Sequence, residues 1–462
     1  MLQRSRPKKR QIAPSTKRVR VPCASSRGED QVHGFLEAFA QLVPTTKWAV
    51  LPRRRGCAPR VPLTCVVQAL VFHLVHRFGT LGEHFALLFE DALNDSSSSE
   101  RRTGLPWHVF ADLMRCALRP LARARRDKGC FWRGWRLVAV DGTQHSVSNT
   151  PQNNAALPKA KSRRGRAAFA KISTSVLLEV GLHNPLAAAI GHDGRSEWEL
   201  TRSLLAQLPK QALLLADRLH GCAAFVAQVL EACERVGSRF LIRARSNIKA
   251  RTLRRFKDGS RLVSVPVYAK GSRKVLKQIT LREIRIRVTR PGHRAQLLRL
   301  WTNLLDPAEA PALELAELYA RRWEHELYYR EIKRVLRKNE LLNSHTVETA
   351  AQEIAALVLI SAMLARERVR AAAGEVPALS ISFAKSLELV RSLWTVFALG
   401  EDIIPEELKQ ELTERLYAHL RECTTPPKRN RSCPRKVRQP VSKWPRLIDN
   451  ASHQGDISFR IL

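Results

Sequence analysis

Apolar residues recur at helical spacing in the first part of the chain, from Phe35 to about Leu121. Around Ala69 and Leu74 the apolar side chains stand three and four positions apart, which places them on one face of a helix. Prolines and the serine run 96–99 interrupt the pattern. Because Pro and Ser clusters mark loops between periodic segments, we expect a small all-helical domain here.

The pattern changes after Cys130, where short apolar runs replace the helical spacing. Five of these runs have the length of buried strands: 137–140, 172–180, 186–190, 212–216 and 240–242. Two stretches at helical spacing, 196–208 and 223–236, separate the last three runs. The order of three strands, helix, strand, helix, strand predicts an α/β fold with a mixed sheet.

The next segment, at about 246–303, is β-like and very basic. Val263, Val265 and Val267 alternate with other residues, and Arg285 and Arg287 alternate with apolar residues, which is the period of a strand. A long helical pattern follows from Pro311 to about Asn339, and more helices are predicted at 346–373 and 380–420.

These patterns divide the chain into four parts. We expect a disordered basic arm at 1–30, a helical domain at 31–129, an α/β core at 130–400 with the β-rich insertion at about 246–303, and a C-terminal helix and basic tail at 401–462.

The net charge of the chain indicates what kind of molecule it binds. The chain has 79 Lys and Arg against 42 Asp and Glu, a formal net charge of +37. Such an excess over a large globular chain is typical of a protein that binds a polyanion, usually nucleic acid. The alternative is a ribosome-associated or merely basic protein whose arginine content follows codon bias.

Membrane and secreted classes fit poorly. In the apolar C-terminal half the longest uncharged stretch, 354–365, is shorter than the roughly 20 residues of a spanning helix. The basic N-terminus has no apolar block behind it, so it does not predict a secretory signal. The nine cysteines form no C-x-x-C pair, which argues against a zinc knuckle or a disulfide framework. We expect reduced thiols in a cytoplasmic protein.

Two aspartates follow predicted strands of the same sheet. Asp141 closes the run 137–140, and Asp217 closes the run 212–216. One such residue can be a simple turn former. Two at the carboxyl edge of an α/β sheet, in a protein this basic, suggest carboxylates that hold divalent metal against a phosphodiester.

A third carboxylate is expected from the helical segment after Pro311. At 100° per residue, one face of that helix, within an arc of roughly 60°, would carry four functional groups: Tyr319, Arg322, Glu326 and Lys333. A solvated amphipathic face with ion pairs is the alternative for this helix alone. The two aspartates favour the catalytic interpretation, with Glu326 as the third carboxylate.

The spacing Tyr319-x2-Arg322-x3-Glu326-x6-Lys333 resembles the Y-R-E-K signature of bacterial transposases of the insertion-sequence-4 family, which are DDE transposases. The stretches 140–143, 217–218, 240–245 and 341–346 also look like that family, and the resemblance covers about 135–365. It implies a ribonuclease-H-like core with a β-rich insertion before the glutamate helix. In one place the chain departs from the family, which commonly has a glycine and an aromatic residue where Leu219 and His220 follow Arg218.

The resemblance also implies an activity. The protein would be a transposase that cuts and joins DNA at the terminal inverted repeats of an insertion sequence, binding double-stranded DNA of the element and of the target, as a homodimer in the DNA complex. The helical domain at 31–129 would contribute DNA binding. Asp141, Asp217 and Glu326 would hold two divalent ions about 4 Å apart. Mg²⁺ suits such hard oxygen ligands, with Mn²⁺ as a substitute.

The basic and polar groups of the motif would contact DNA. Arg322 suits a bidentate grip on phosphate, Lys333 supplies a point charge, and Tyr319 supplies a hydrogen bond to phosphate. A basic loop between the first two strands, with Arg163 and Arg164, would grip phosphate near the metal site, unless it is simply a solvated loop.

Other residues near the motif carry weaker signals. Trp301 is more often a core residue than a stacking platform. His145 and His220 lie close in sequence to the aspartates and would at most support the metal ligands.

Two other functions remain open from the sequence. A ribonuclease-H-like metal-dependent nuclease would share the carboxylates but would not need the Y-R-E-K face. A catalytically inactive transposase-derived DNA-binding regulator would not need Asp141, Asp217 and Glu326, all of which are present. Short inverted repeats that flank the coding region would favour the transposase.

Overall fold

The computed structural model describes residues 34–43, 61–76, 78–89, 93–162, 165–269, 271–289, 295–338, 341–425 and 458–462. The arm predicted at 1–30, the basic segment 426–446 and the candidate DNA contacts Arg163 and Arg164 lie outside these residues.

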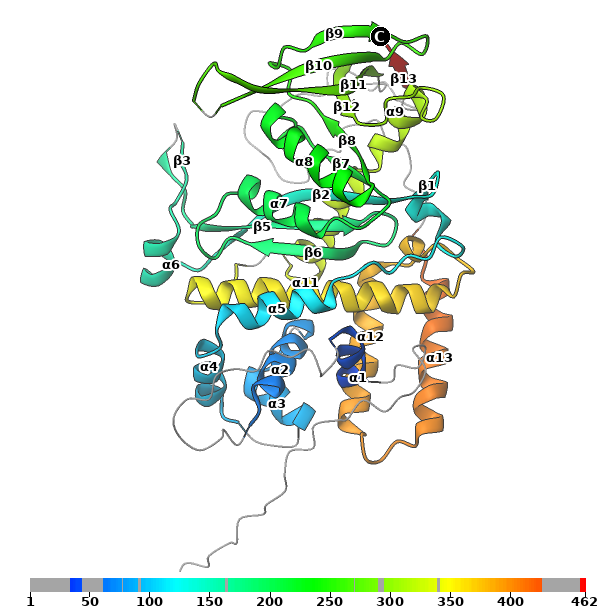
Figure 1. The fold of residues 1–462 in the computed structure, drawn as a ribbon. Helices are drawn as coiled ribbons and strands as arrows, with labels where there is room; N and C mark the ends of the chain where they lie inside the picture. Colours follow the sequence, from blue (N-terminus) through cyan, green and yellow to red (C-terminus); the bar gives the residue numbers. More distant parts are fainter. Residues whose placement is uncertain are drawn as a thin grey trace, which may run out of the picture.

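A mixed sheet forms the centre of the molecule (Figure 1). Its first half consists of β2 (Trp135–Ser146), β5 (Lys171–Glu179), β6 (Asn184–Ile190), β7 (Ala212–Ala216) and β8 (Arg239–Arg243). These strands lie in the order β6-β5-β2-β7-β8. β5 is antiparallel to both of its neighbours, β6 and β2, while β7 runs parallel to β2 and β8 parallel to β7. This arrangement is the ribonuclease-H-like topology, and the expected fold class is confirmed.

Both faces of the central strands β2, β7 and β8 are buried, which explains why these strands are continuous apolar runs rather than alternating ones. On one face Val138 and Val140 pack with α7 (Glu197–Leu204) and α8 (Ala223–Val236). On the other face Leu137 and Ala139 pack with α9 (Ala312–Ala320).

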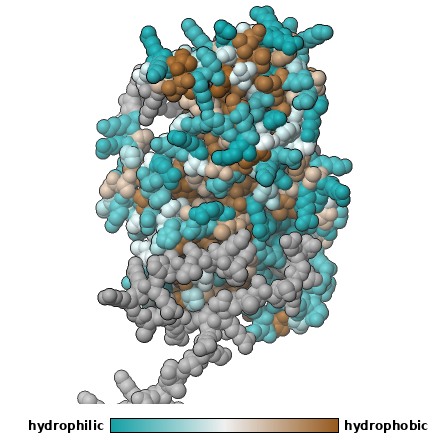
Figure 2. All heavy atoms as spheres, viewed as in Figure 1, coloured by the Kyte–Doolittle hydropathy of each residue, from teal (hydrophilic) through white to brown (hydrophobic). Residues whose placement is uncertain are grey.

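The β-rich insertion continues the same sheet. It consists of β9 (Arg251–Arg255), β10 (Arg261–Tyr268), β11 (Val275–Thr289) and β12 (Gln296–Thr302). β12 pairs with β8, and β13 (Ser458–Ile461), at the end of the chain, pairs with β11. The predicted alternation holds, because Val263, Val265 and Val267 are buried. In the view of Figure 2 hydrophilic side chains cover much of this region, with apolar groups between them.

Helices from both ends of the sequence form a layer beside the sheet (Figure 1). They are α1 (Phe35–Leu42), α2 (Leu63–Val75), α3 (Leu81–Phe89), α4 (Asp95–Thr103), α5 (Trp107–Ala117), α11 (Val347–Ala372), α12 (Phe383–Leu399) and α13 (Glu406–Glu422). The shorter elements are η2 (Lys128–Cys130), β1 (Phe131–Trp132), α6 (Pro151–Ala156), β3 (Lys161–Ser162), β4 (Gly165–Arg166), η3 (Leu205–Gln207) and η5 (Ala378–Ser380).

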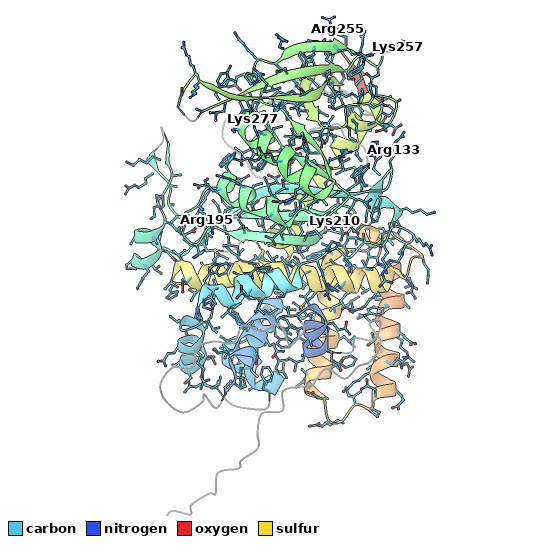
Figure 3. The ribbon with its side chains drawn as sticks, in the orientation of Figure 1. Arg133, Arg195, Lys210, Arg255, Lys257 and Lys277 are labelled. Carbon is cyan, nitrogen blue, oxygen red and sulfur yellow. The ribbon has the colours of Figure 1, made fainter. Side chains whose placement is uncertain are left out.

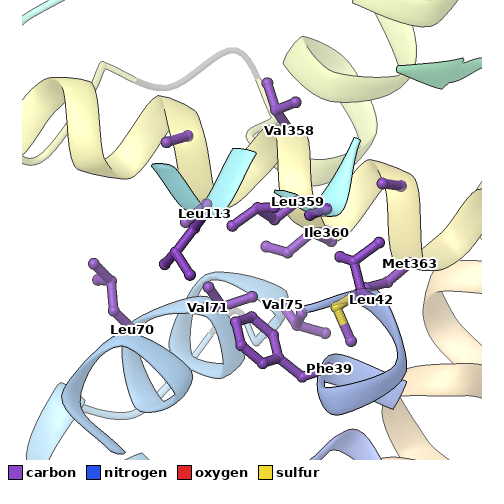
Figure 4. Close-up of a cluster of buried hydrophobic side chains, with 14 of the residues drawn as sticks. Phe39, Leu42, Leu70, Val71, Val75, Leu113, Val358, Leu359, Ile360 and Met363 are labelled. Atoms are coloured by element: carbon purple, nitrogen blue, oxygen red, sulfur yellow. The ribbon is translucent and has the colours of Figure 1, made fainter. Parts of the chain in front are cut away.

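Within this layer α11 is the helix that packs most extensively against the sheet, next to β6, and most of the other helices pack against α11. In Figure 4 its residues Ile360 and Met363 lie in one apolar cluster with Phe39 of α1 and Val71 of α2. The helices of the N-terminal third therefore share a core with α11 and α12. Among the described residues α11 is also the one helix long and apolar enough to cross a membrane, but 94% of its apolar window is buried inside the protein, as in the core helix of a folded domain.

The long helix predicted from Pro311 to Asn339 is wrong as one continuous element. The segment divides into α9, α10 (Trp323–Arg330) and the π-helix η4 (Glu331–Leu336). Between α9 and α10 the backbone N–H groups of 321, 322, 324 and 325 donate to carbonyls three residues earlier, so the chain tightens there. Tertiary contacts hold the break, since Arg321 donates to the carbonyl of Gly129 and Glu324 accepts from the N–H of Gly181. A face calculated at 100° per residue therefore does not extend across this segment.

Three histidines pack against one another between α2 and α3. Nδ1 of His73 lies 3.0 Å from Nδ1 of His84, and the ring centroid of His76 lies 4.8 Å from that of His84. Burial, reinforced by the neighbouring His84, lowers the pKa of His73 to about 4. Burial also lowers the pKa of His76 to about 4. The folded protein thus keeps these rings neutral at mildly acidic pH.

Acid should destabilise the protein through this histidine cluster. The unfolded chain binds protons near pH 6.5, whereas the folded rings bind them only near pH 4, so stability is complete above about 6.5 and falls as the pH decreases toward 4. We expect a loss on the order of 2 kcal/mol from His73 alone. Urea unfolding between pH 4.5 and 7.5 measures it. His73→Gln should flatten the pH dependence, and His419→Gln, at an exposed position of α13, should not. Equal slopes for His73→Gln and the unchanged protein would contradict this account.

Candidate active site

The two aspartates are neighbours because of strand register. β2 and β7 pair in parallel, with Val140 opposite Ala216 as the last pair, so the next residue on each strand is Asp141 and Asp217. The sequence interpretation placed Asp141 at the end of its strand, which is wrong. β2 continues to Ser146, because residues 141–146 still pair with β5. β7 ends at Ala216, so from Asp141 onward β2 no longer has β7 beside it and pairs only with β5.

The two carboxylates differ in their environment. Burial and the nearby charge of Asp217 raise the pKa of Asp141 to about 6. Burial also raises the pKa of Asp217, but hydrogen bonds from the His220 side chain and from the backbone outweigh it and leave this pKa below its usual value. The site thus holds one readily ionised carboxylate and one that is costly to ionise without a neighbouring cation.

Glu326 reaches the same edge of the sheet from α10. Arg322, just before α10, donates to Asp141 Oδ2 at 3.3 Å and to Glu326 Oε1 at 2.9 Å. Its guanidinium therefore bridges the carboxylates of the first and third predicted acidic residues, which are 185 positions apart in the sequence (326 minus 141).

Glu197 is a fourth carboxylate at this site, and sequence reasoning missed it. It is the first residue of α7 and is half-buried against Gly142. A Cβ at position 142 would lie 2.1 Å from the Glu197 side chain, so a larger residue there would force Glu197 to move. Burial raises the pKa of Glu197, and the charge of Asp217 adds to this. No spacing in the sequence links residue 197 to the aspartates.

Two tyrosines support the backbone of the aspartates. The hydroxyl of Tyr319 is buried and donates to the carbonyl of Ala216 at 3.2 Å, and the hydroxyl of Tyr329 donates to the carbonyl of Asp141 at 2.8 Å. The sequence interpretation assigned Tyr319 to a phosphate contact. In the structure its hydroxyl instead binds the residue before Asp217. The sequence analysis did not predict a role for Tyr329.

Lys333 lies on the π-helix η4 and reaches the far part of β2. Its Nζ donates to the carbonyl of Gln144 at 2.8 Å, three residues beyond Asp141. π-helical turns within α-helices are frequent at functional sites, since they displace side chains from regular spacing. The Lys333 side chain is half-buried, and the carbonyl that it contacts belongs to β2, the strand that carries Asp141.

The other residues considered in the sequence analysis are a tryptophan and two histidines, and all three are buried. Trp301 is fully buried and donates from Nε1 to Glu283 at 3.0 Å, so it is a core residue. Burial lowers the pKa of the His145 ring to about 3, and Lys333 contributes to this shift. His220 contacts Asp217 directly.

The donor atoms suit a divalent cation. Asp141 and Asp217 bring two negative charges together in a partly buried place, and burial together with the charge of Asp217 raises the pKa of Asp141, which a divalent cation bound there would lower. Among the residues that the structure describes, no three His, Cys, Asp or Glu side chains lie together as a ready metal cluster. The guanidinium of Arg322 stands between Asp141 and Glu326 instead. Oxygen ligands of this kind fit hard divalent ions.

A ribonuclease-H-like sheet with acidic residues on two adjacent strands and on a helix across its edge defines a class of metal-dependent phosphodiester-processing enzymes. The family described as "Transposase DDE domain" matches residues 132–364, half of the chain, and the chain belongs to this family. It is a DNA transposase, and members of this family cleave and transfer DNA in a reaction that depends on divalent metal.

The chain is also similar to individual proteins. The chain is 28% identical over 324 residues to the transposase InsG for insertion sequence element IS4 of Escherichia coli strain K12, covering 68% of this chain and 70% of the relative. The match supports membership of the insertion-sequence-4 group. Among solved structures, the piggyBac transposase synaptic complex with hairpin DNA aligns with a TM-score of 0.42 and 11% identity, over 84% of this chain and 86% of that one.

Proposed function

We propose that this transposase excises an insertion sequence at its terminal inverted repeats and joins the excised ends to target DNA, with Asp141, Asp217 and Glu326 as its metal ligands. The observation that carries the proposal is the register of β2 and β7, which sets Asp141 beside Asp217, together with the Arg322 bridge from Asp141 to Glu326. The metal is Mg²⁺, with Mn²⁺ as a substitute, because the donors are hard oxygens. Two such ions would activate the attacking oxygen and stabilise the leaving one.

The protein's own residues then bind and orient the DNA. Arg322 can exchange its carboxylate partners for a phosphate, which it grips with two parallel N–H bonds. Lys333 contributes a point charge further along β2. Arg163 and Arg164, which lie outside the described residues, are assigned to the DNA backbone by charge alone.

Tyr319 acts in this proposal mainly through its contact with Ala216. The buried hydroxyl keeps the end of β7 in place and with it the backbone of Asp217. A phosphate contact by Tyr319 would require the side chain to leave this position.

Basic side chains outside the site extend the DNA-binding surface. Arg255 and Lys257 lie on the insertion, Lys277 on β11, and Arg133, Arg195 and Lys210 beside the core sheet (Figure 3). A transposition complex with two ends needs two active sites, so a homodimer on DNA is part of the proposal. The compartment is the bacterial cytoplasm, at the nucleoid when DNA is bound.

A cleavage and joining assay distinguishes the three functions. The substrate is linear DNA that carries the element between its inverted repeats, incubated with the protein, a target plasmid and Mg²⁺. We expect an excised fragment and a joined product, both lost in EDTA. A nuclease would cleave without joining, and an inactive regulator would bind without cleaving. Either result with a correctly folded protein would overturn the proposal.

A further inference from the structure

Asp217 is held by a histidine in its own turn. The side chain of His220 is fully buried, and its Nδ1 lies 2.9 Å from Asp217 Oδ1. The backbone N–H groups of Leu219 and His220 donate to the same oxygen, at 2.8 and 3.4 Å. Oδ1 thus has three donors, whereas no hydrogen bond between described residues involves Oδ2 of Asp217. One oxygen of this carboxylate is occupied and the other remains available.

The other side of the histidine ring is anchored in the core. Nε2 of His220 lies 3.2 Å from Oγ1 of Thr201 on α7, which lies 2.8 Å from Oγ of Ser175 on β5. Oγ of Ser175 is 3.3 Å from the carbonyl oxygen of Asp141. Thr201 and Ser175 are both fully buried. A continuous buried chain of polar groups therefore joins the carboxylate of Asp217 to the strand that carries Asp141.

This chain fixes the orientation of the ring. When Nδ1–H donates to the carboxylate, Nε2 of the neutral imidazole is the acceptor, and the Thr201 hydroxyl donates to it. The single hydrogen of the Ser175 hydroxyl then goes either to Thr201 Oγ1 or to the carbonyl of Asp141. Rotation of the ring would break both bonds inside the core, at the cost of unpaired buried polar groups. Partners of this kind, which hold a ligand side chain from behind, set the geometry of metal sites.

The backbone of the turn is equally constrained. Gly221 is pressed against the end of β8, where a Cβ would lie 2.0 Å from the carbonyl oxygen of Arg243. The N–H of Arg245 donates to the carbonyl of Gly221 at 3.1 Å. The last residue of the turn 217–221 is therefore held against the end of β8, and His220 has little freedom to move away from Asp217.

We propose that His220, anchored by Thr201, is a positioning residue that occupies one oxygen of Asp217 and turns the other toward the divalent metal. This inference rests on the proposed function, because it takes Asp217 as a metal ligand. It predicts that loss of His220 weakens metal binding and leaves DNA binding unchanged, since the ring is buried and has no access to DNA.

Mn²⁺ serves as the probe, measured in two ways on the full-length protein bound to its inverted-repeat DNA. Electron paramagnetic resonance gives the Mn²⁺ dissociation constant, and cleavage gives the Mn²⁺ concentration for half-maximal rate. For His220→Ala we expect both values to rise about 10- to 100-fold, the range found when such supporting groups are removed. His220→Asn, which keeps an N–H donor near Asp217, should recover most of the loss. Thr201→Val should raise both values several-fold.

The control variant is His192→Ala. His192 is a half-buried histidine in the loop before α7, and its side chain does not contact Asp217. The control variant should leave both values unchanged. A folded His220→Ala protein with an unaltered Mn²⁺ dissociation constant would overturn the inference. If His220→Ala does not fold, Thr201→Val decides, and wild-type Mn²⁺ binding in that variant overturns it as well.

Asp217→Asn separates this inference from the proposed function. If Asp217→Asn still binds Mn²⁺ and cleaves at the wild-type rate, the proposed function itself is wrong. If Asp217→Asn is inactive while His220→Ala binds Mn²⁺ normally, only the positioning role of His220 is wrong.

Discussion

Glu326→Gln is expected to abolish DNA cleavage while leaving binding to the inverted repeat nearly intact. The substitution keeps the size of the side chain and removes the charge that the proposed metal site needs. We expect the cleavage rate to fall by roughly 10³-fold or more, the scale of losses seen when single catalytic groups are removed. Affinity for DNA should stay the same or rise slightly, because one negative charge near the phosphates is lost.

The measurement combines a Mg²⁺-dependent cleavage assay with a binding assay on the same DNA fragment. Glu317→Gln is the matched control, since Glu317 is exposed on the neighbouring helix α9. It should cleave normally. Cleavage by Glu326→Gln at the wild-type rate would show that the assignment of the third carboxylate is wrong.

Arg282→Met is expected to cause the largest loss of stability. Arg282 is a fully buried arginine on β11 that pairs with Asp258 and donates from Nε to Ser260 at 2.8 Å. Its Nη1 donates to the carbonyl of Ala310, in the loop that leads into α9. Methionine fills the space, but the carbonyl of Ala310 loses this donor, and Asp258 loses its cation and keeps only the hydrogen bonds from Ser260 and Ala312. We expect a loss of about 2–4 kcal/mol, because a buried group that loses its hydrogen-bond partner costs about 1–3 kcal/mol, and more when the partner is charged.

Chemical denaturation of the purified protein measures the effect. Arg287→Met, at an exposed position five residues further along β11, is the control and should change stability by no more than about 0.5 kcal/mol. Because the same loop positions α9 and Tyr319, Arg282→Met should also reduce cleavage near its unfolding midpoint. Similar unfolding free energies for Arg282→Met and Arg287→Met would contradict the role of the buried pair.

Local pattern was sufficient for most of the fold. The apolar runs 137–140 and 212–216 became central strands because their residues are buried on both faces. The predicted helix 223–236 coincides with α8. Alternation identified β10 and β11, since a strand that is half buried must present every second side chain to the core. The type and position of a helix or strand depend on a few neighbouring residues, so they can be predicted from the sequence.

The candidate acidic residues were also proposed from local sequence, Asp141 and Asp217 because they follow apolar runs and Glu326 because of the Y-R-E-K spacing. Their geometry could not be predicted in this way. Strand register, which depends on pairing between β2 and β7, decided that Asp141 lies beside Asp217 in the middle of a strand rather than at its end. Pairing partners lie far apart in the sequence, and no local pattern specifies how far a strand continues beside them.

Tertiary contacts also decided the course of the segment that carries Glu326. Arg321 and Glu324 bind backbone groups near residues 129 and 181, and the helix tightens and breaks between them. A helical wheel assumes an uninterrupted helix, so it placed the hydroxyl of Tyr319 on a DNA-facing surface, whereas the structure buries it against Ala216. The contact of Glu197 with Gly142 and that of His220 with Thr201 also join separate segments of the chain, so the sequence did not predict them.

The sequence by itself determined which elements and which chemical groups this protein has, because these follow from short-range pattern and composition. Only the tertiary structure decided which of those groups meet, because hydrogen bonds and close packing between distant segments choose the partners.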